Sequence, residues 1–155
     1  MKSTRSVTLK SNHHISICIC TYKRRELLTR LLSALEAQET GGFFEYSIVI
    51  VDNDRHESAR QAVAAFAGRS EICIKYFVEP QQGIARARNT AVSSAEGDLI
   101  AFIDDDEFPE KDWLLNLFNA LFEFECDGVL GPVLPHFDVA PPSWVLKGGF
   151  FDRPT

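Results

Sequence analysis

Short apolar runs alternate along this chain with longer segments of helical periodicity. Residues 15–21 are apolar enough to form a buried strand, and residues 24–38 place a stripe of leucines on one helical face. The same patterns predict further strands over residues 46–52, 72–78, 99–104 and 129–134, and further helices over residues 57–67, 84–95 and 110–124. Alternating strands and helices favour parallel pairing with right-handed crossovers. We therefore expect an α/β fold, a mostly parallel sheet with helices on both faces.

Composition places the chain among single globular domains. It has 155 residues, of which 45% are hydrophobic, and its formal net charge of -6 argues against a general nucleic-acid binder. We expect the domain to cover residues 15–135, after an N-terminal extension at residues 1–14. Prolines and glycines in residues 136–155 predict a loop or the start of a truncated element there.

The extension and the cysteines point to a cytoplasmic protein. Residues 1–14 lack the apolar core of a secretory signal, and no run approaches the roughly 20 apolar residues of a membrane span. Peripheral contact with the inner face of the cell membrane stays open. The four cysteines match no zinc pattern and lie in or beside apolar runs, so we expect buried, reduced thiols at Cys18, Cys20, Cys73 and Cys126.

The acidic run Asp104-Asp105-Asp106-Glu107 directly follows an apolar strand. Neighbouring carboxylates resist ionising together unless a cation neutralises them. Residues two apart in an extended strand share a face and lie roughly 6 to 7 Å apart, so Asp104 and Asp106 can converge on one ion. Oxygen ligands favour Mg²⁺ or Mn²⁺, and Mg²⁺ is often completed by substrate phosphates. The alternative is a solvated acidic turn before the helix expected near Glu110.

Two other loops carry polar groups to the same edge of a parallel sheet. The first strand is followed by Tyr22-Lys23-Arg24, and the second ends in Asp52-Asn53-Asp54. Asp52 can accept hydrogen bonds from a nucleobase or a ribose, and Tyr22 can stack beside the base. Equally, Asp52 can form a turn or a helix cap, and Tyr22 can simply pack.

The helix over residues 84–95 opens with basic and amide side chains. Gly83 suits a tight turn, and arginine forks match phosphate oxygens near a helix start. Arg86 and Arg88 are two residues apart and cannot point the same way, so at most one is expected to reach a phosphate directly. The alternative is an ordinary solvated helix face.

Taken in order, residues 17–24, 48–54, 83–89 and 97–106 resemble the family 2 glycosyltransferases of the GT-A fold. The resemblance covers residues 15–135. Residues 131–135 and 142–151 are further similar to the succinoglycan-type exopolysaccharide glucosyltransferases. The family implies a nucleotide-sugar donor, most often UDP-linked, a divalent metal at a DxD motif, and transfer with inversion to a glycan or lipid-linked acceptor in polysaccharide synthesis.

The resemblance also implies roles for single residues. The metal, Mn²⁺ or Mg²⁺, would be held by Asp106 and by Asp104. The nucleotide sugar would be bound by Thr21, Tyr22, Asp52, Asp54, Arg86, Arg88, Asn89, Asp104 and Asp105.

The family's general base is an Asp or Glu from a later block, and no such block is present before Thr155. Asp138 and Asp152 do not stand in the expected context. The resemblance therefore implies the donor-binding part of a larger enzyme, able to bind a donor without turning it over. Apolar residues near the end, Trp144, Phe150 and Phe151, would then be exposed, which predicts either self-association as a homo-oligomer or a disordered tail.

Two rival functions remain. A metal-dependent nucleotidyltransferase also uses carboxylate-bound Mg²⁺, although its glycine-rich phosphate loop after the first strand is absent here. A non-catalytic nucleotide-sugar-binding module would use the acidic run only as a cap or a contact. A Rossmann dinucleotide site is disfavoured because no GxGxxG motif occurs.

Overall fold

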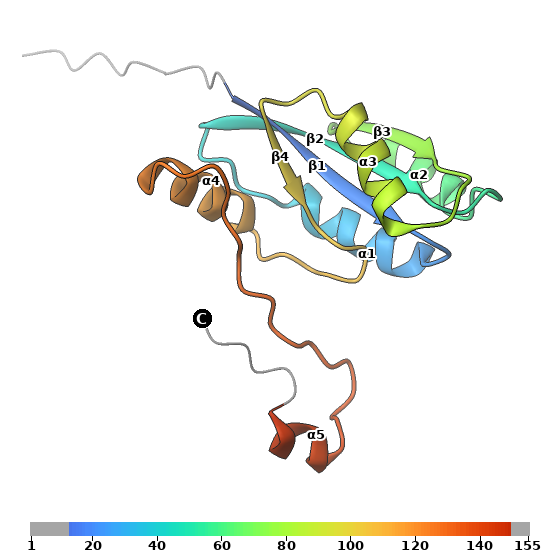
Figure 1. Cartoon of the computed structure of the whole chain (residues 1–155), viewed down its shortest axis with the longest axis vertical. Coiled ribbons are helices and arrows are strands. Elements are labelled where there is room, and N and C mark those ends of the chain that lie inside the picture. The colour runs from blue at the N-terminus through green and yellow to red at the C-terminus, as the bar shows by residue number, and fades with distance from the viewer. Residues whose placement is uncertain (1–12, 150–155) are drawn as a thin grey trace, which may run out of the picture. The chain divides into compact units, whose positions relative to one another are not determined.

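The computed structural model describes residues 13–149 (Figure 1). Strands and helices alternate along the chain until two helices follow each other at its end. The elements in chain order are β1 (His13–Thr21), α1 (Arg25–Glu36), β2 (Phe44–Asp52), α2 (Arg60–Ala67), β3 (Cys73–Val78), α3 (Ile84–Ser94), β4 (Leu99–Phe102), α4 (Trp113–Glu123) and α5 (Ser143–Gly148).

The strands form one parallel sheet in the order β3-β2-β1-β4. Successive strands step outward from β1 to β3, and the chain then returns across the sheet to place β4 on the other side of β1. The order thus reverses between β1 and β4, which is where ligands bind in sheets of this kind. In the register, Thr21 pairs with Asp52 and Cys18 pairs with Phe102, so the strand ends are brought to one edge.

Helices cover both faces of the sheet, as expected from the sequence. Ala87 and Ala91 of α3 pack on Cys18, Val49 and Val51, and Figure 1 shows α3 on the opposite face from α1 and α2. The leucine stripe of α1 supplies four fully buried side chains, Leu28, Leu31, Leu32 and Leu35. Burying a leucine contributes about 1.5–3 kcal/mol relative to exposing it, so this stripe holds α1 against the sheet.

Several element bounds differ from those expected. β1 begins at His13, so the expected N-terminal extension includes two residues of the strand; residues 1–12 lie outside the described part. β4 ends at Phe102 instead of residue 104, and α4 begins at Trp113 instead of residue 110. Pro109 precedes α4, and the amide of Trp113 donates to the carbonyl of Glu110 in a turn that comes before the helix.

The expected strand over residues 129–134 is wrong. These residues are irregular, and Leu130 is 98% exposed. Pro132 lacks the amide proton that a strand pairing requires, and Gly128 and Gly131 weaken any strand further. The loop or truncated element expected over residues 136–155 contains the six-residue helix α5, which is followed by Gly149 in the left-handed conformation with φ 55°.

The chain divides into two compact units, Met1–Asn116 and Leu117–Thr155. The second unit carries many exposed apolar side chains, among them Phe124, Val139 and Trp144. Phe150 and Phe151, expected to be exposed with Trp144, lie outside the described residues. Nowhere in residues 13–149 does a helix combine the length and the apolar character that a bilayer crossing requires.

The four cysteines are free thiols, but they are not all buried. Cys18 is buried and Cys20 half-buried, because both lie on β1 beneath α3. Cys73 and Cys126 are exposed, which corrects the expectation of four buried thiols. Cys73 is the first residue of β3, the outer strand of the sheet. Apolar neighbours in the sequence do not ensure that a residue at such an edge is buried.

Candidate functional site

The acidic run forms a turn at the carboxyl end of β4, and we call residues 104–107 the acidic turn. Just before this turn, the amide of Ile103 donates to the carbonyl of Cys18 on β1 over 3.3 Å. The amide of Glu107 then donates to the carbonyl of Asp104 (3.1 Å), and the Glu107 carboxylate accepts from the Asp104 amide (3.1 Å). Asp104 and Asp106 therefore lie in a turn, not on one face of a strand as the sequence suggested.

Asp105 is the buried member of the acidic turn, with 4% of its surface exposed. Its Oδ2 accepts a 2.8 Å hydrogen bond from Oγ1 of Thr21, the last residue of β1. Its Oδ1 accepts from Nη1 of Arg24 over 3.0 Å. One oxygen of this carboxylate is thus held by the end of β1 and the other by the loop that follows it, which satisfies the requirement that a buried charge be paired.

Asp104 and Asp106 are the exposed members, with side chains 58% and 49% exposed. Asp106 accepts a 2.8 Å contact from the same Nη1 of Arg24, and Asp104 lies 3.2 Å from Nη2 of Arg88. The two aspartates beside Arg24, Asp105 first, raise the pKa of its guanidinium. In this structure, arginines supply the positive charge that the adjacent carboxylates require.

Asp52 is completely buried at the end of β2. Its Oδ1 accepts from the amide of Asp54 (3.0 Å), forming an Asx turn, and its Oδ2 accepts from the amide of Ala59 (2.8 Å) and the hydroxyl of Tyr76 (2.8 Å). Burial, and next the hydrogen bond to Asp52, raise the pKa of Tyr76. Both oxygens of Asp52 are engaged within the protein, in the structural role that the sequence left open.

Asp54 and Tyr22 flank this edge of the sheet. Asp54 is buried, and its carboxylate accepts a hydrogen bond from the amide of His56 (3.1 Å). This hydrogen bond holds the pKa of Asp54 below its ordinary value. Tyr22 is 39% exposed, and the ammonium group of Lys23 lies 5.1 Å from the centre of its ring. The ring of Tyr22 is therefore open to a ligand on part of its surface.

The helix α3 brings one of its two arginines to the acidic turn. Arg88 pairs with Asp104 and lies 5.8 Å from the ring centre of Phe102, whereas Arg86 is exposed. Asn89 is also exposed, because Ala87 and Ala91 take the sheet-facing side of the helix. Neither Arg86 nor Asn89 bonds to the acidic turn in the part of the chain that the structure describes.

Asn53, which sequence analysis did not single out, joins three loops of this edge. Its amide donates to the carbonyl of Thr21 (2.8 Å), and its side-chain Nδ2 donates to the carbonyls of Glu79 (2.8 Å) and Gln81 (3.0 Å). Its Oδ1 accepts from the amide of Gly83 (2.7 Å), which has φ 152° at the start of α3. An asparagine directly after a buried strand and before a turn was the available signal, since its amide side chain can donate and accept at once.

Arg24 is the second residue with an unforeseen role. The sequence showed it only as one of several basic residues after the first strand, with nothing to indicate that it would face the acidic turn. The register of β1 against β4 makes that meeting possible, because Phe102 pairs with Cys18 and the chain beyond it runs alongside Thr21.

The carboxylate oxygens of the acidic turn suit a hard divalent cation whose remaining coordination positions are filled by a ligand. Within residues 13–149 no group of three or more His, Cys, Asp or Glu side chains is arranged to hold a metal ion. Mg²⁺ is commonly bound by one or two carboxylates together with substrate phosphates, so two half-exposed carboxylates fit that mode and do not form a cage by themselves. The fit is therefore to a cation that arrives with a phosphorylated ligand.

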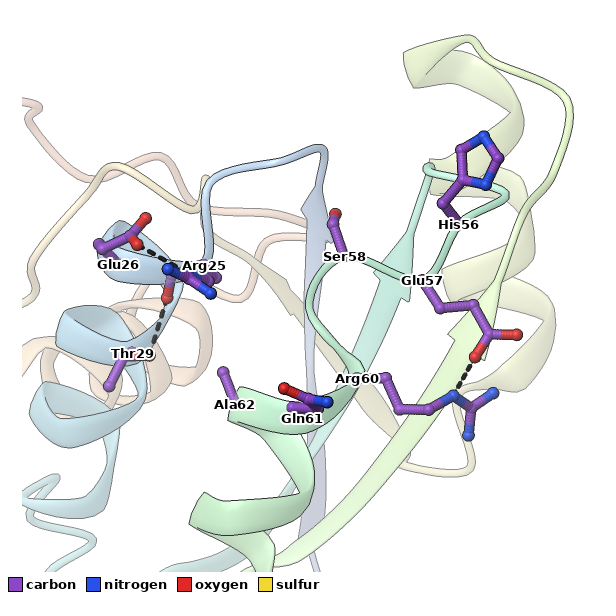
Figure 2. Close-up of a pocket in the computed structure, with 9 residues that line it drawn as sticks. All are labelled: Arg25, Glu26, Thr29, His56, Glu57, Ser58, Arg60, Gln61 and Ala62. Carbon is purple, nitrogen blue, oxygen red and sulfur yellow. Dashed lines mark hydrogen bonds and ion pairs between the residues drawn. The ribbon is translucent and has the colours of Figure 1, made fainter.

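An open depression of about 780 Å³ lies elsewhere in the same unit, between the start of α1 and residues 56–62 (Figure 2). Its charged side chains are already paired, Arg25 with Glu26 and Arg60 with Glu57. None of its lining residues belongs to the acidic turn. The size of this depression therefore does not make it the functional site, and the charged edge near β1 and β4 remains the candidate.

Comparison with known proteins places this architecture in one family. The family model described as "Glycosyl transferase family 2" matches residues 16–153. The "Succinoglycan biosynthesis protein ExoM" of Rhizobium meliloti (strain 1021) is 36% identical over 137 residues, which is 88% of this chain and 44% of that protein.

Two solved structures share the fold. The crystal structure of "S. aureus TarS 1-349 in complex with UDP-GlcNAc" matches with a TM-score of 0.62 and 25% identity over 79% of this chain and 37% of that one. The "Mannosyltransferase PcManGT from Pyrobaculum calidifontis in complex with GDP-Man and Mn2+" matches with a TM-score of 0.61 and 24% identity, over 69% of this chain and 32% of that one. The chain thus has a GT-A-like α/β fold and spans less than half the length of these proteins.

Proposed function

We propose that this chain, which belongs to glycosyl transferase family 2, binds the nucleotide-sugar donor of a glycosyltransferase that acts in polysaccharide synthesis. The observation that carries the proposal is the meeting of Thr21, Arg24 and Arg88 with the acidic turn at the point where the strand order reverses. Guanidinium groups, carboxylates and a half-exposed tyrosine ring lie along one edge of the sheet, and these are side chains of the kinds that can bind phosphates, a cation and a base.

The similar proteins support a nucleotide sugar as the ligand. The TarS structure contains UDP-GlcNAc and the mannosyltransferase structure contains GDP-Man, so proteins of this fold bind nucleotide sugars of both kinds. We propose a UDP-linked sugar. Thr21, Tyr22, Asp52 and Asp54 would line or support the nucleoside pocket, and Arg86, Arg88 and Asn89 would serve the ribose and diphosphate, with Asp104 and Asp105 beside them.

We propose that Asp52 and Asp105 both support the loops that surround the pocket. Both carboxylates are buried and already accept hydrogen bonds within the protein, Asp52 from Tyr76 and Asp105 from Thr21. Such groups fix the shape of a pocket by holding the loops around it, because a buried carboxylate cannot leave its donors without a penalty. The exposed side chains of this edge, Asp106 and Arg88 among them, are the ones that a ligand can contact directly.

A divalent cation, Mn²⁺ or Mg²⁺, would be held by Asp106 and Asp104. When bound, such a cation neutralises the charge that develops on a leaving diphosphate. The mannosyltransferase of similar fold is in complex with Mn²⁺. In this chain Arg88 would orient the donor's phosphates, and Thr21 would hold Asp105, the buried member of the acidic turn, in place.

Transfer with inversion to a glycan or lipid-linked acceptor would require a general base. Of the two carboxylates considered from the sequence, Asp138 is exposed and lies 3.1 Å from His136, and Asp152 lies outside the described residues. We propose that the base belongs to a part of the relatives that this chain does not span. The chain alone would then bind the donor without turnover.

Calorimetric titration tests the proposal. UDP, GDP and a nucleoside triphosphate are titrated into the chain with and without Mn²⁺, and the titrations are repeated on Asp106→Ala. We expect UDP to bind at least about tenfold more tightly with Mn²⁺, and Asp106→Ala to remove that difference. Asp127→Ala, which removes an exposed carboxylate from the second unit, serves as the control and should behave as the wild type.

Two results would contradict the proposal. Equal affinity of UDP with and without Mn²⁺ would remove the metal-dependent site and leave a non-catalytic binding module. Tighter binding of the triphosphate than of UDP, again dependent on metal, would favour nucleotidyl transfer.

A further inference from the structure

A single guanidinium nitrogen joins the buried and the exposed members of the acidic turn. Nη1 of Arg24 lies 3.0 Å from Oδ1 of Asp105 and 2.8 Å from Oδ2 of Asp106. We propose that Arg24 is the built-in counterion of the acidic turn, fixed to Asp105 and exchangeable at Asp106, so that a divalent cation must displace it to bind. The proposal rests on the cation site assigned above and deepens it.

The two carboxylates differ in how firmly the protein holds them. Asp105 is buried, and its second oxygen is occupied by the Thr21 hydroxyl, so its contact with Arg24 belongs to a closed group of three side chains. Asp106 is half exposed and touches Arg24 through Oδ2. Exposed ion pairs contribute little because water screens them, whereas a buried carboxylate cannot give up its partner cheaply. The contact between Arg24 and Asp106 is therefore the one that breaks when a cation binds.

Arg24 is able to move without disturbing the fold. Its carbonyl accepts from the amide of Leu28 over 3.0 Å, which fixes its backbone at the start of α1. Its side chain is 52% exposed, so the guanidinium has room to turn away from Asp106 toward solvent while it stays beside Asp105. The preceding residue, Lys23, has φ 56°, so the backbone bends sharply just before Arg24.

Charge explains why the exchange matters. With Arg24 in place, one positive group serves two carboxylates, and the acidic turn is stable without metal. A divalent cation at Asp106 competes with that guanidinium for the same oxygen. Removal of the Arg24 charge should therefore strengthen metal binding, although most losses of a side chain at a site weaken binding.

The test measures Mn²⁺ affinity in the presence of UDP at one fixed concentration, by the electron paramagnetic resonance signal of free Mn²⁺, on the full chain. Arg24→Gln should bind Mn²⁺ about two- to fivefold more tightly than the wild type, the range set by a screened ion pair. Arg25→Gln is the matched control, since the neighbouring Arg25 pairs with Glu26 and does not face the acidic turn. Its Mn²⁺ affinity should equal that of the wild type.

A second pair of variants checks that the effect passes through Asp106. In an Asp106→Asn background, Arg24→Gln should leave Mn²⁺ affinity unchanged. If Arg24→Gln lacks cooperative unfolding, Arg24→Met keeps the aliphatic stem and is expected to show the same gain. Unchanged or weaker Mn²⁺ binding in the folded variant overturns the counterion role.

The outcomes separate this inference from the proposed function. If UDP binding to the wild type depends on Mn²⁺ but Arg24→Gln gives no gain in Mn²⁺ affinity, the inference is wrong and the donor-binding function stands. If the wild type binds neither Mn²⁺ nor UDP, both are wrong. A gain at Arg24→Gln that disappears in the Asp106→Asn background supports the exchange.

Discussion

Oγ1 of Thr21 lies 2.8 Å from Oδ2 of Asp105, although the two residues are 84 positions apart in the chain. This hydrogen bond ties the end of β1 to the turn that follows β4. It is buried, so neither partner can exchange the other for water without cost. The position of the acidic turn therefore depends on the central strand of the sheet.

Replacement of Thr21 by valine should destabilise the fold. Thr21→Val keeps the shape of the side chain but leaves one oxygen of the buried Asp105 carboxylate without its donor, which costs about 1–3 kcal/mol. Urea unfolding measures the loss. Thr29→Val is the control, because the Thr29 hydroxyl bonds to the Arg25 carbonyl on an exposed helix surface. Equal stabilities of the two variants would show that the Thr21 hydroxyl does not hold Asp105.

The two arginines of α3 should contribute unequally to donor binding. Arg88 contacts Asp104 in the acidic turn and Arg86 does not, so Arg88→Gln removes the arginine charge that we propose lies nearest to a bound diphosphate. We expect Arg88→Gln to lower UDP affinity in the presence of Mn²⁺ by about tenfold or more, the value of a charge-assisted hydrogen bond. Calorimetry on Arg86→Gln provides the comparison. A larger loss at Arg86 would reverse the assignment.

A methyl group at Gly97 should not be tolerated. A Cβ at this position would lie 2.5 Å from the carbonyl oxygen of His14 and 2.7 Å from the amide nitrogen of Ser16, both backbone atoms of β1. Gly97→Ala must therefore push β1 away from the segment before β4, at a cost of about 1–3 kcal/mol. Gly128→Ala meets nothing within 4 Å and is the matched control in urea unfolding. A Gly97→Ala variant as stable as this control would contradict the close approach.

Stability should fall with rising pH between about 9 and 11. Burial raises the pKa of Cys18 and of Cys20 from 9.0 to about 11, so the unfolded chain releases these thiol protons before the folded chain does. The stabilisation is complete below pH 9 and is lost as the pH rises toward 11, because the unfolded state then binds fewer protons. Urea midpoints measured from pH 8 to pH 10 should decline.

The double variant Cys18→Ala with Cys20→Ala should show a shallower decline across the same interval. Cys73→Ala, which removes an exposed thiol, should keep the slope of the wild type. Identical slopes in all three proteins would assign the pH dependence to other groups.

The strands and helices of the first unit could be predicted because the apolar residues of each recur at a regular spacing. The leucines of α1 recur at helical spacing, and of the five predicted to face the core four are buried and Leu27 is half-buried. β1 and β2 are apolar on both faces, as expected for strands covered by helices on both sides. The sheet order could not be predicted in the same way, because the crossover rule fixes the hand of each connection and not the side of β1 on which β4 is added.

The contacts of the site could not be predicted with the same ease. The acidic run indicated a cation site, but it gave no sign that β4 would end at Phe102 and release Asp104 into a turn. Nor did the sequence show which of several basic residues would meet each carboxylate, because Arg24 faces Asp105 only through the register of β1 against β4. The strand expected at residues 129–134 failed because apolar residues there are interrupted by Gly131 and Pro132.

The position of β1 between β2 and β4 has a consequence for synthesis of the protein. A nascent chain emerging from the ribosome can pair β1 with β2 early, but the other side of β1 stays open until translation has passed residue 102. A message truncated before that point would release a product with an unprotected strand of alternating isoleucine and cysteine, which is a template for intermolecular β-pairing. The last strand added to the sheet thus also protects the first from aggregation.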